Sequence, residues 1–407
     1  KAMKWERILL MCIRVGIFLA AVTPLLFTNK TFFPTLAPQT VYFRVLTEFL
    51  FALYLLLLLE SRAWLPRKSS LVISLGVFLS VLTLTSLLGI HPGKSFWGTF
   101  HRMEGLIAFI HYGLFFIVLA GVLKRTNDWF YLFRFVLFVS VPIGIIGFLE
   151  HFSLTDFLTA QDSTRIDATL GNPALYGGYL LFLIFFGILL TLKEQKSAWK
   201  VYAWVVTVFN GILLLFSGTR SAWIALALGI GFLFFSLLLL FRERFGKSSR
   251  SILAGFAVFL AIVLVALFAW QRQILPQNTP WDRYLLLWQE GGPSENSRLI
   301  LWSLALQAWQ NAPVFGYGLD SFARLYDTYY EPSFLREIPE FEFYDKAHNV
   351  FLEFLTASGI IGLLAYLAIF ASAFRMLQKS WRESHSTISI VLAGLVLAYL
   401  AHNMFVF

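Results

Sequence analysis

The sequence contains a single cysteine, Cys12, and few charged residues. Asp, Glu, Lys and Arg make up 14% of the 407 residues, whereas soluble domains carry about a quarter. One cysteine excludes a disulfide scaffold, and a hydrophobic content of 58% excludes a disordered chain. Aromatic residues reach 18%. This composition argues against a soluble globular protein and predicts that lipid surrounds most of the chain.

Motifs that mark common cofactor and metal sites are also missing. The sequence has no Walker motif, no GxGxxG, no CxxC and no HExxH, and its seven histidines are scattered. We therefore expect neither a cofactor nor a bound metal, and nothing points to nucleic acid as a partner.

The chain has instead many long apolar runs. Eleven of them approach the roughly 20 residues that a helix needs to cross the hydrocarbon core of a bilayer. Such runs must be helical, because lipid offers no hydrogen-bond partner to an open backbone. The prediction is an all-α integral membrane protein with eleven or twelve transmembrane helices. The runs are 8–27, 41–59, 71–90, 105–123, 129–149, 173–192, 199–216, 221–241, 252–270, 349–374 and 388–405.

The distribution of Lys and Arg predicts the orientation. With the N-terminus in the cytoplasm, the inside segments, which include 375–387, hold 18 Lys and Arg, and the short outside loops hold five. By the positive-inside rule the large loop 271–348 then faces outward. Within it, the mostly apolar segment 297–309 predicts a helix at the outer interface.

Three regions follow from this arrangement. Residues 1–270 hold the first nine transmembrane helices, 271–348 form the large outward loop with its short helices, and 349–407 hold helices ten and eleven. Because the last apolar segment stops abruptly, we expect a further span or a soluble domain beyond it.

Basic groups recur at the outward starts of the spans. An outward helix start presents free N–H groups and the positive pole of the helix dipole, which suit an anion. The groups at these starts are Arg44, Arg102, Arg165, Arg220 and His348.

Several of these groups also have a local, structural interpretation. Arg102 has Glu104 two residues away, and Arg44 has Glu48 one helical turn away, so each could form a local ion pair. Arg165 precedes Asn172, which suits a helix N-cap followed by proline.

Arg220 and His348 are the strongest candidates for chemistry. Arg220 lies in the very short turn Ser217-Gly218-Thr219-Arg220-Ser221, where it could hold a specific phosphate or merely reach lipid phosphate. His348 follows the long outward loop and has Asp345 and Asn349 nearby. Histidine titrates near neutrality and is the usual general base, although an interfacial histidine can also be structural.

These segments resemble the O-antigen ligase family of polytopic membrane glycosyltransferases, which includes protein O-oligosaccharyltransferases. The resemblance covers residues 96–362 and rests on the order of several weak motifs. They are an H-[NSQ]-x9-G-x-x-G pattern (His348, Asn349, Gly359, Gly362), an SR-xxx-W helix (Ser297, Arg298, Trp302), the PVFGYGLDSF turn (313–322), the GNP start (171–173) and the SGTRSA turn (217–222).

The resemblance implies a GT-C fold that acts on the outer face of the bacterial cytoplasmic membrane. The donor would be a glycan on undecaprenyl diphosphate, and the acceptor a hydroxyl on lipid A-core, protein or another glycan. Neither a nucleotide sugar nor a metal would be needed. His348 would be the general base, and Arg220 and Arg298 would hold the diphosphate. Further candidates for substrate binding are Arg165, Arg102, Asn349 and Asn172.

Other functions remain open at this stage. An O-antigen or exopolysaccharide polymerase, or a protein O-oligosaccharyltransferase, would use the same donor and differ only in its acceptor. A lipid-linked glycan flippase or transporter would instead have ionisable groups near the midplane and inverted repeats. The sequence shows neither feature. Its noteworthy cations gather at one predicted face instead of near the midplane, and it has no repeat of fixed period. A non-catalytic assembly protein would not need them.

Overall fold

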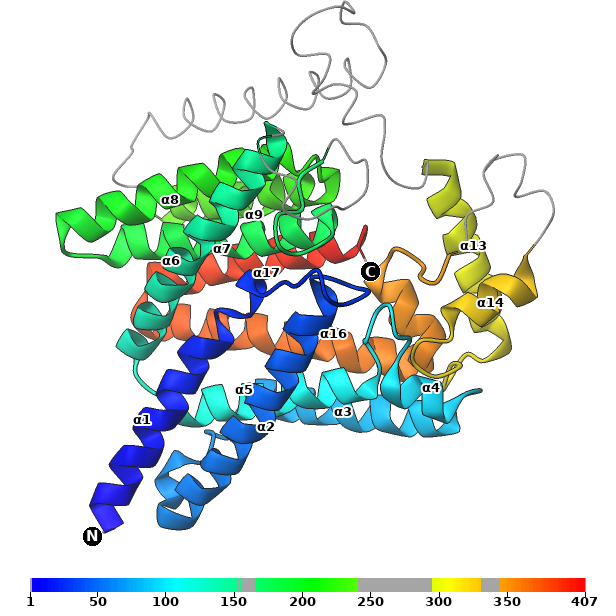
Figure 1. Ribbon diagram of the computed structural model, residues 1–407, viewed down its shortest axis with the longest axis horizontal. Helices are drawn as coiled ribbons and strands as arrows, with labels where there is room; N and C mark the ends of the chain where they lie inside the picture. The colour runs from blue at the N-terminus through cyan, green and yellow to red at the C-terminus, as the bar shows by residue number, and fades with distance from the viewer. Residues whose placement is uncertain (1, 153, 155–164, 241–294, 331–343, 407) are drawn as a thin grey trace, which may run out of the picture.

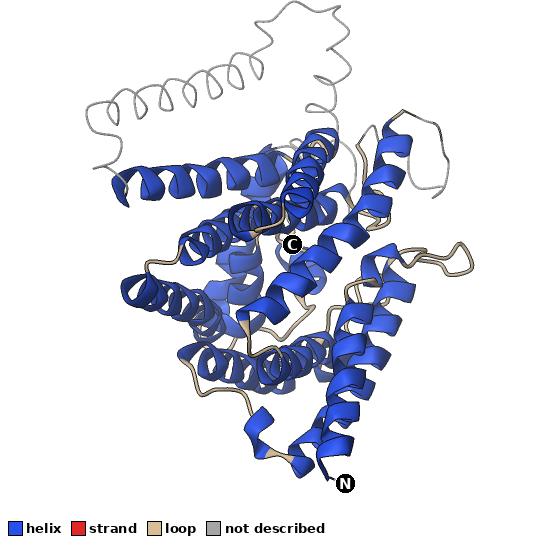
Figure 2. Ribbon diagram, turned by 90° about the vertical axis from the view of Figure 1, so that its left-hand side faces the viewer, coloured by secondary structure: helices blue, strands red, loops and turns tan. Residues whose placement is uncertain are grey.

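The computed structural model describes residues 2–152, 154, 165–240, 295–330 and 344–406. Regular secondary structure in these ranges is entirely helical (Figure 2). Nine of the eleven predicted spans lie wholly in these ranges, as does the eighth, 221–241, up to residue 240, and each of these ten contains a helix. The ninth, 252–270, lies outside the described residues. The helices are α1 (Ala2–Ala20), α2 (Leu36–Glu60), α3 (Ser70–Leu88), α4 (Pro92–Trp97), α5 (Leu106–Val122), α6 (Thr126–His151), α7 (Pro173–Lys193), α8 (Ser197–Phe216), α9 (Arg220–Leu240), α13 (Glu295–Asn311), α14 (Phe322–Tyr329), α16 (Val350–Ser384) and α17 (Thr387–Asn403).

The predicted class, an all-α integral membrane protein, is confirmed. Seven described helices are long and apolar enough to cross a membrane: α2, α3, α6, α7, α8, α9 and α16. Helices α5 and α17 are apolar but slightly shorter. The predicted helix over 297–309 is present as α13.

Helix α7 lies at the centre of the bundle and packs against α6, α8, α9 and α17. Its Phe185 is fully buried and reaches the place where α9 and α17 approach each other most closely. A Cβ at Gly229 would lie 2.7 Å from the carbonyl oxygen of Gly394. Small residues allow two helix backbones to come this close in a membrane, where helix association depends on van der Waals contact.

Helix α16 is longer than predicted. The tenth span was expected to end at residue 374, but the helix continues to Ser384, and His385 caps it in the left-handed conformation. The expected inside segment 375–387 is therefore mostly helical. Hydropathy detects where a chain leaves lipid, and a helix can continue into water beyond that point.

Helix α16 is also broken at Gly359, which has φ 64° and ψ −167°. This conformation is essentially restricted to glycine. The N–H of Ile360 donates to the carbonyl of Pro313 (2.9 Å) instead of to its own helix. A Cβ at Gly359 would lie 2.1 Å from the carbonyl oxygen of Val314. The break is therefore filled by the backbone of the 313–318 turn.

The turn also satisfies carbonyl groups that the break leaves open. The N–H of Tyr317 donates to Thr356 (2.9 Å), and the N–H of Gly318 donates to Ala357 (2.8 Å). On its other side, the carbonyl of Tyr317 accepts from Ile90, just after α3 (3.0 Å). The 313–318 turn thus links the first part of α16 to α3.

The short helices and the start of α16 lie at one end of the bundle. Figure 1 shows α4, α13, α14 and the start of α16 at the same end of the molecule, with the N-terminus at the opposite end. This is the end that the charge distribution predicts to face outward.

Candidate functional site

His348 lies in the short segment 344–349 that leads into α16, and its backbone is left-handed (φ 51°). Met103 and Asp320, in neighbouring loops, are also left-handed (φ 53° and 57°). Such conformations cost free energy for residues other than glycine and persist only where the surroundings hold them. The contacts around His348 explain how it is held.

Asp345 anchors this segment to the loop before α5. Its carboxylate accepts hydrogen bonds from Arg102 Nε (2.8 Å) and Nη2 (2.9 Å), and it also contacts His101 Nε2 (2.7 Å). Burial alone would raise the pKa of Asp345, but Arg102 and His101 hold it well below its usual range. Asp345 is therefore ionised at neutral pH and fixes the chain three residues before His348.

Lys346 forms a second anchor. Its side chain is buried, and Nζ lies 3.4 Å from Glu104 Oε2 and 3.5 Å from Glu353 Oε1. Burial would lower the pKa of Lys346, but these two carboxylates raise it above its ordinary value. Glu353 also accepts the N–H of Ala347 (3.1 Å). Asp345, Lys346 and Ala347 are thus each tied to other parts of the protein, so the backbone that leads to His348 is held in place.

Two local ion pairs suggested by the sequence are replaced by longer-range contacts. Arg102 hydrogen-bonds Asp345, and Glu104 instead meets Lys346. Arg44 donates to the carbonyl of Met103 (2.6 Å), and Glu48 lies 3.0 Å from His111 Nε2. The reason is that tertiary packing brings groups from distant parts of the chain closer to Arg102 and Arg44 than their charged neighbours in the sequence.

The His348 ring is mostly buried and lies edge-on to Tyr344, with ring centroids 6.0 Å apart. Burial, followed by the charges of Arg298 and Arg102, lowers the pKa of His348 to about 4, although Asp345 opposes this shift. The ring is consequently neutral at pH 7, which is the state that can accept a proton.

Arg165 belongs to a second cluster, around the turn between α8 and α9. Its Nε donates to the carbonyl of Ser217 (3.0 Å), and Nη2 donates to Thr219 Oγ1 (3.1 Å). Thr219 Oγ1 donates in turn to the carbonyl of Pro173, at the start of α7 (2.8 Å). Gly218, with φ 58°, lets the turn fit beneath the Arg165 side chain. The starts of α7 and α9 are therefore joined through Arg165 and Thr219.

Arg220 and Arg298 lie close enough to Arg165 for their charges to interact. Burial, then Arg220, then Arg298 lower the pKa of Arg165. Because Arg298 also acts on His348, it connects the Arg165 cluster with the His348 segment. Guanidinium groups that lie near one another can bind the oxygens of an anionic ligand from several sides. The structure thus brings together three predicted cations and the predicted base.

Asn172 and Asn349 both act as helix N-caps. Asn172 Oδ1 accepts from Ala174 N (2.8 Å) and Leu175 N (3.3 Å), as its position before Pro173 predicts. Asn349 Oδ1 accepts from Phe351 N (3.0 Å) and Leu352 N (3.2 Å). These bonds occupy the side-chain oxygens of both residues.

Sequence reasoning missed His402, at the end of α17. Its side chain is 3% exposed, and Nδ1 has no hydrogen-bond partner among the described residues. The ring lies against the backbone of Ala174 in α7 and of Ser221 in α9. His402 therefore contacts the first turns of both helices that carry the Arg165 cluster. The available signal in the sequence was a histidine within an apolar run.

The described parts of the chain contain no group of three or more His, Cys, Asp or Glu side chains placed to hold a metal ion.

Comparison with protein families identifies the central part of the chain. Residues 203–367 match the family model described as O-antigen ligase. The chain carries an O-antigen ligase domain. The family predicted from the sequence motifs is thereby confirmed for these residues, and the apolar helices are those of a multi-pass membrane protein. No curated protein gave a match to this chain.

The O-antigen ligase domain contains most of the site. Arg220, Arg298, His348 and both motif glycines, Gly359 and Gly362, lie within the matched residues. Arg102 and Arg165 precede the matched region and reach the site through tertiary contacts, Arg102 through Asp345 and Arg165 through Thr219.

Proposed function

We propose that this protein transfers a glycan from undecaprenyl diphosphate to an acceptor hydroxyl on the outer face of the bacterial cytoplasmic membrane. The observation that carries the proposal is the cluster of Arg165, Arg220 and Arg298, of which Arg298 lies within electrostatic reach of His348. Guanidinium groups suit a diphosphate because their planar fork matches the geometry of its oxygens. The match to O-antigen ligase supports the same chemistry.

In the proposed reaction, His348 accepts the proton of the acceptor hydroxyl as its oxygen attacks the anomeric carbon of the donor sugar. The bond between that carbon and the diphosphate oxygen breaks, and undecaprenyl diphosphate leaves with the bonding electron pair. Arg220 and Arg298 stabilise the charge that develops on the diphosphate, since guanidinium groups bind phosphate oxygens in a fixed fork. In this mechanism a histidine accepts the hydroxyl proton, and arginine side chains stabilise the negative charge on the diphosphate.

Binding of the donor would also improve the base. Arg298 contributes to the low pKa of His348, so neutralising Arg298 with a diphosphate raises that pKa toward its ordinary value. A stronger base is then present only when the donor is bound.

The remaining residues have supporting roles in the proposal. Arg102 holds Asp345 and thereby His348, and Arg165 holds the turn that carries Arg220. Asn349 and Asn172 fix the helix starts beside these groups. In the proposed GT-C architecture, residues 1–270 and 349–407 would hold the membrane helices and loop 271–348 would lie outside, so that all of these groups would face the donor's side of the membrane.

The test uses the purified protein with a glycan on undecaprenyl diphosphate and lipid A-core, protein or glycan acceptors, in the presence of a chelator. We expect metal-independent transfer by the wild type and its loss in His348→Ala. A single added glycan indicates ligation, and a ladder of products indicates polymerisation. Loss of activity with the chelator, or full turnover by His348→Ala, would overturn the mechanism.

A further inference from the structure

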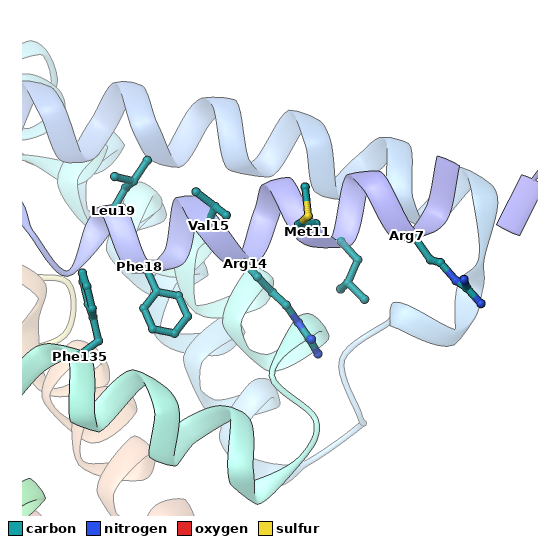
Figure 3. A pocket seen from close by; sticks show the side chains of 8 residues that line it. Arg7, Met11, Arg14, Val15, Phe18, Leu19 and Phe135 are labelled. Carbon is teal, nitrogen blue, oxygen red and sulfur yellow. The ribbon is translucent and has the colours of Figure 1, made fainter. Parts of the chain in front are cut away.

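Two adjoining cavities lie at the end of the molecule opposite the candidate site, between α1 and α6 and toward the start of α8. Their volumes are about 460 and 690 Å³, within the range of ligand pockets. Arg14, Phe18 and Phe135 line both. In Figure 3, Phe18 and Phe135 meet on one side of Arg14, and Arg7 lies on the other. The two cavities form one apolar groove with cations along it.

Arg14 lacks adequate partners in this groove. Its Nη2 lies 3.5 Å from Asp128 Oδ2, longer than the usual ~2.7–2.9 Å of a charge-assisted hydrogen bond. The same carboxylate oxygen also accepts the backbone N–H of Arg125 (3.2 Å). Arg14 Nε is buried and has no hydrogen-bond partner among the described residues.

The depth of Arg14 makes this deficit significant. It lies seven residues beyond Arg7 along α1, which is roughly 10 Å at the rise of an α-helix. A guanidinium at that depth in lipid needs oxygen partners, because hydrocarbon supplies none.

The far wall of the groove adds charge and aromatic rings. Arg134 hydrogen-bonds Glu194 through Nε (2.9 Å), between the rings of Tyr131 and Trp199. Lys196 stands at the N-terminus of α8, where the helix dipole also favours an anion. Four cations, Arg7, Arg14, Arg134 and Lys196, thus face two carboxylates, Asp128 and Glu194. The groove has an excess of positive charge beside an apolar channel.

We propose that this groove binds an anionic glycerophospholipid of the inner leaflet, with its phosphate on Arg14 and an acyl chain against Phe18 and Phe135. The proposal rests on the predicted orientation, which places this end in the cytoplasm, and not on the proposed glycan transfer. A phosphate supplies the oxygens that Arg14 lacks, and basic pockets between helices at the cytoplasmic side suit such headgroups.

Native mass spectrometry of the purified chain tests this binding. The protein in detergent is titrated with phosphatidylglycerol or with phosphatidylcholine of the same acyl chains. We expect phosphatidylglycerol to be retained about tenfold more strongly, because the choline cation of phosphatidylcholine cancels the charge of the same phosphate and is repelled by the excess of cations in the groove. Equal retention of the two lipids would overturn the proposal, since the groove would then not select a headgroup of net negative charge.

Two variants separate charge from shape. Arg14→Gln removes the cation, and Phe18→Trp fills the channel while every charge stays in place. Each should abolish the preference for phosphatidylglycerol. Arg375→Gln is the matched control, because Arg375 is an exposed cation at the same end of the bundle on α16, outside the groove. The proposal would be contradicted if both groove variants kept the preference for phosphatidylglycerol. It would also be contradicted if the variants changed the balance of monomer and dimer without losing bound lipid.

Discussion

Arg102 and Asp345 form a two-pronged ion pair, with N–O distances of 2.8 and 2.9 Å, although 243 residues separate them in the chain. This pair joins the loop before α5 to the segment that carries His348. Because His348 has a left-handed backbone that must be held in place, the pair fixes the position of the proposed base.

Asp345→Asn is expected to reduce both stability and activity. The amide keeps the shape but loses the charge, so the free energy of unfolding should fall by about 1–3 kcal/mol. The change loosens the segment that carries His348 and leaves the proposed donor-binding arginines in place. We therefore expect kcat to fall while KM for the donor changes little. Thermal unfolding in detergent and steady-state transfer measure the two effects.

The control for Asp345→Asn is Glu383→Gln. Glu383 pairs with Lys379 at 3.8 Å on the surface of α16, and both side chains are more than half exposed. Such surface pairs contribute about 0–1 kcal/mol. If the two variants lose equal stability and activity, the Asp345 pair does not position His348.

The pH dependence of transfer should reflect the low pKa of His348. A lowered pKa means that the ring is neutral, and active as a base, at every pH above about 4. The acidic limb of kcat/KM, which reports the free enzyme, should therefore fall near pH 4 instead of the ordinary value of about 6.5. The limb of kcat should lie higher, because a bound diphosphate neutralises Arg298.

Arg298→Gln tests the cause of this low pKa. Removing the positive charge should move the acidic limb of kcat/KM upward, whatever happens to the absolute rate. Arg382→Gln, at the other end of α16, should leave the limb in place. A limb near pH 6.5 in the wild type would contradict the burial and charge argument.

Gly359→Ala should be strongly destabilising. Alanine cannot easily adopt φ 64° and ψ −167°, and its Cβ would lie 2.1 Å from the Val314 carbonyl oxygen. The backbone strain alone costs about 1–3 kcal/mol, and the 313–318 turn would also be displaced. Thermal unfolding of the purified protein in detergent measures the loss.

Gly211→Ala is the matched control for Gly359→Ala. Gly211 lies within α8, and a Cβ there would meet nothing within 4 Å. Replacing a helical glycine by alanine stabilises by about 1 kcal/mol, so this variant should unfold at the same or a higher temperature. Equal unfolding temperatures for Gly359→Ala and wild type would mean that the break does not require glycine.

Gly178→Ala should impair donor binding through His402. The new Cβ would lie 3.0 Å from His402 Nε2, so the ring must move away from the starts of α7 and α9. We expect KM for the donor to rise because Arg220 stands at the start of α9. Gly231→Ala, with open space at its Cβ, should behave as wild type. An unchanged KM in Gly178→Ala would separate His402 from the donor site.

Much of the architecture could be predicted because it depends on local composition. An apolar run near 20 residues must be helical in lipid, which predicted α7 within one residue of its observed end at Lys193. Asn172 and Pro173 predicted the start of the same helix, because capping depends on adjacent residues. The end of α16 was missed because Ser384 lies beyond the apolar run, where hydropathy carries no signal.

The candidate site was predicted only as a set of residues. Its basic groups and the family motifs could be recognised because charge is scarce in this sequence. The sequence offered Glu104 as the partner of Arg102, yet packing of α5 and α16 against α3 brings Asp345 closer. His402 was missed because nothing near it in the chain predicts contact with α7 and α9.

The sequence by itself determined that the chain is helical, that it is an integral membrane protein and that it carries an O-antigen ligase domain. Each of these depends on residues adjacent in the chain or spaced along one helix. Only the tertiary structure decided that Arg220 and Arg298 act on Arg165, that Arg298 acts on His348, and that Asp345 and Lys346 anchor the segment before His348. Coulomb interactions and hydrogen bonds depend on distance in space, which spacing along the chain does not determine.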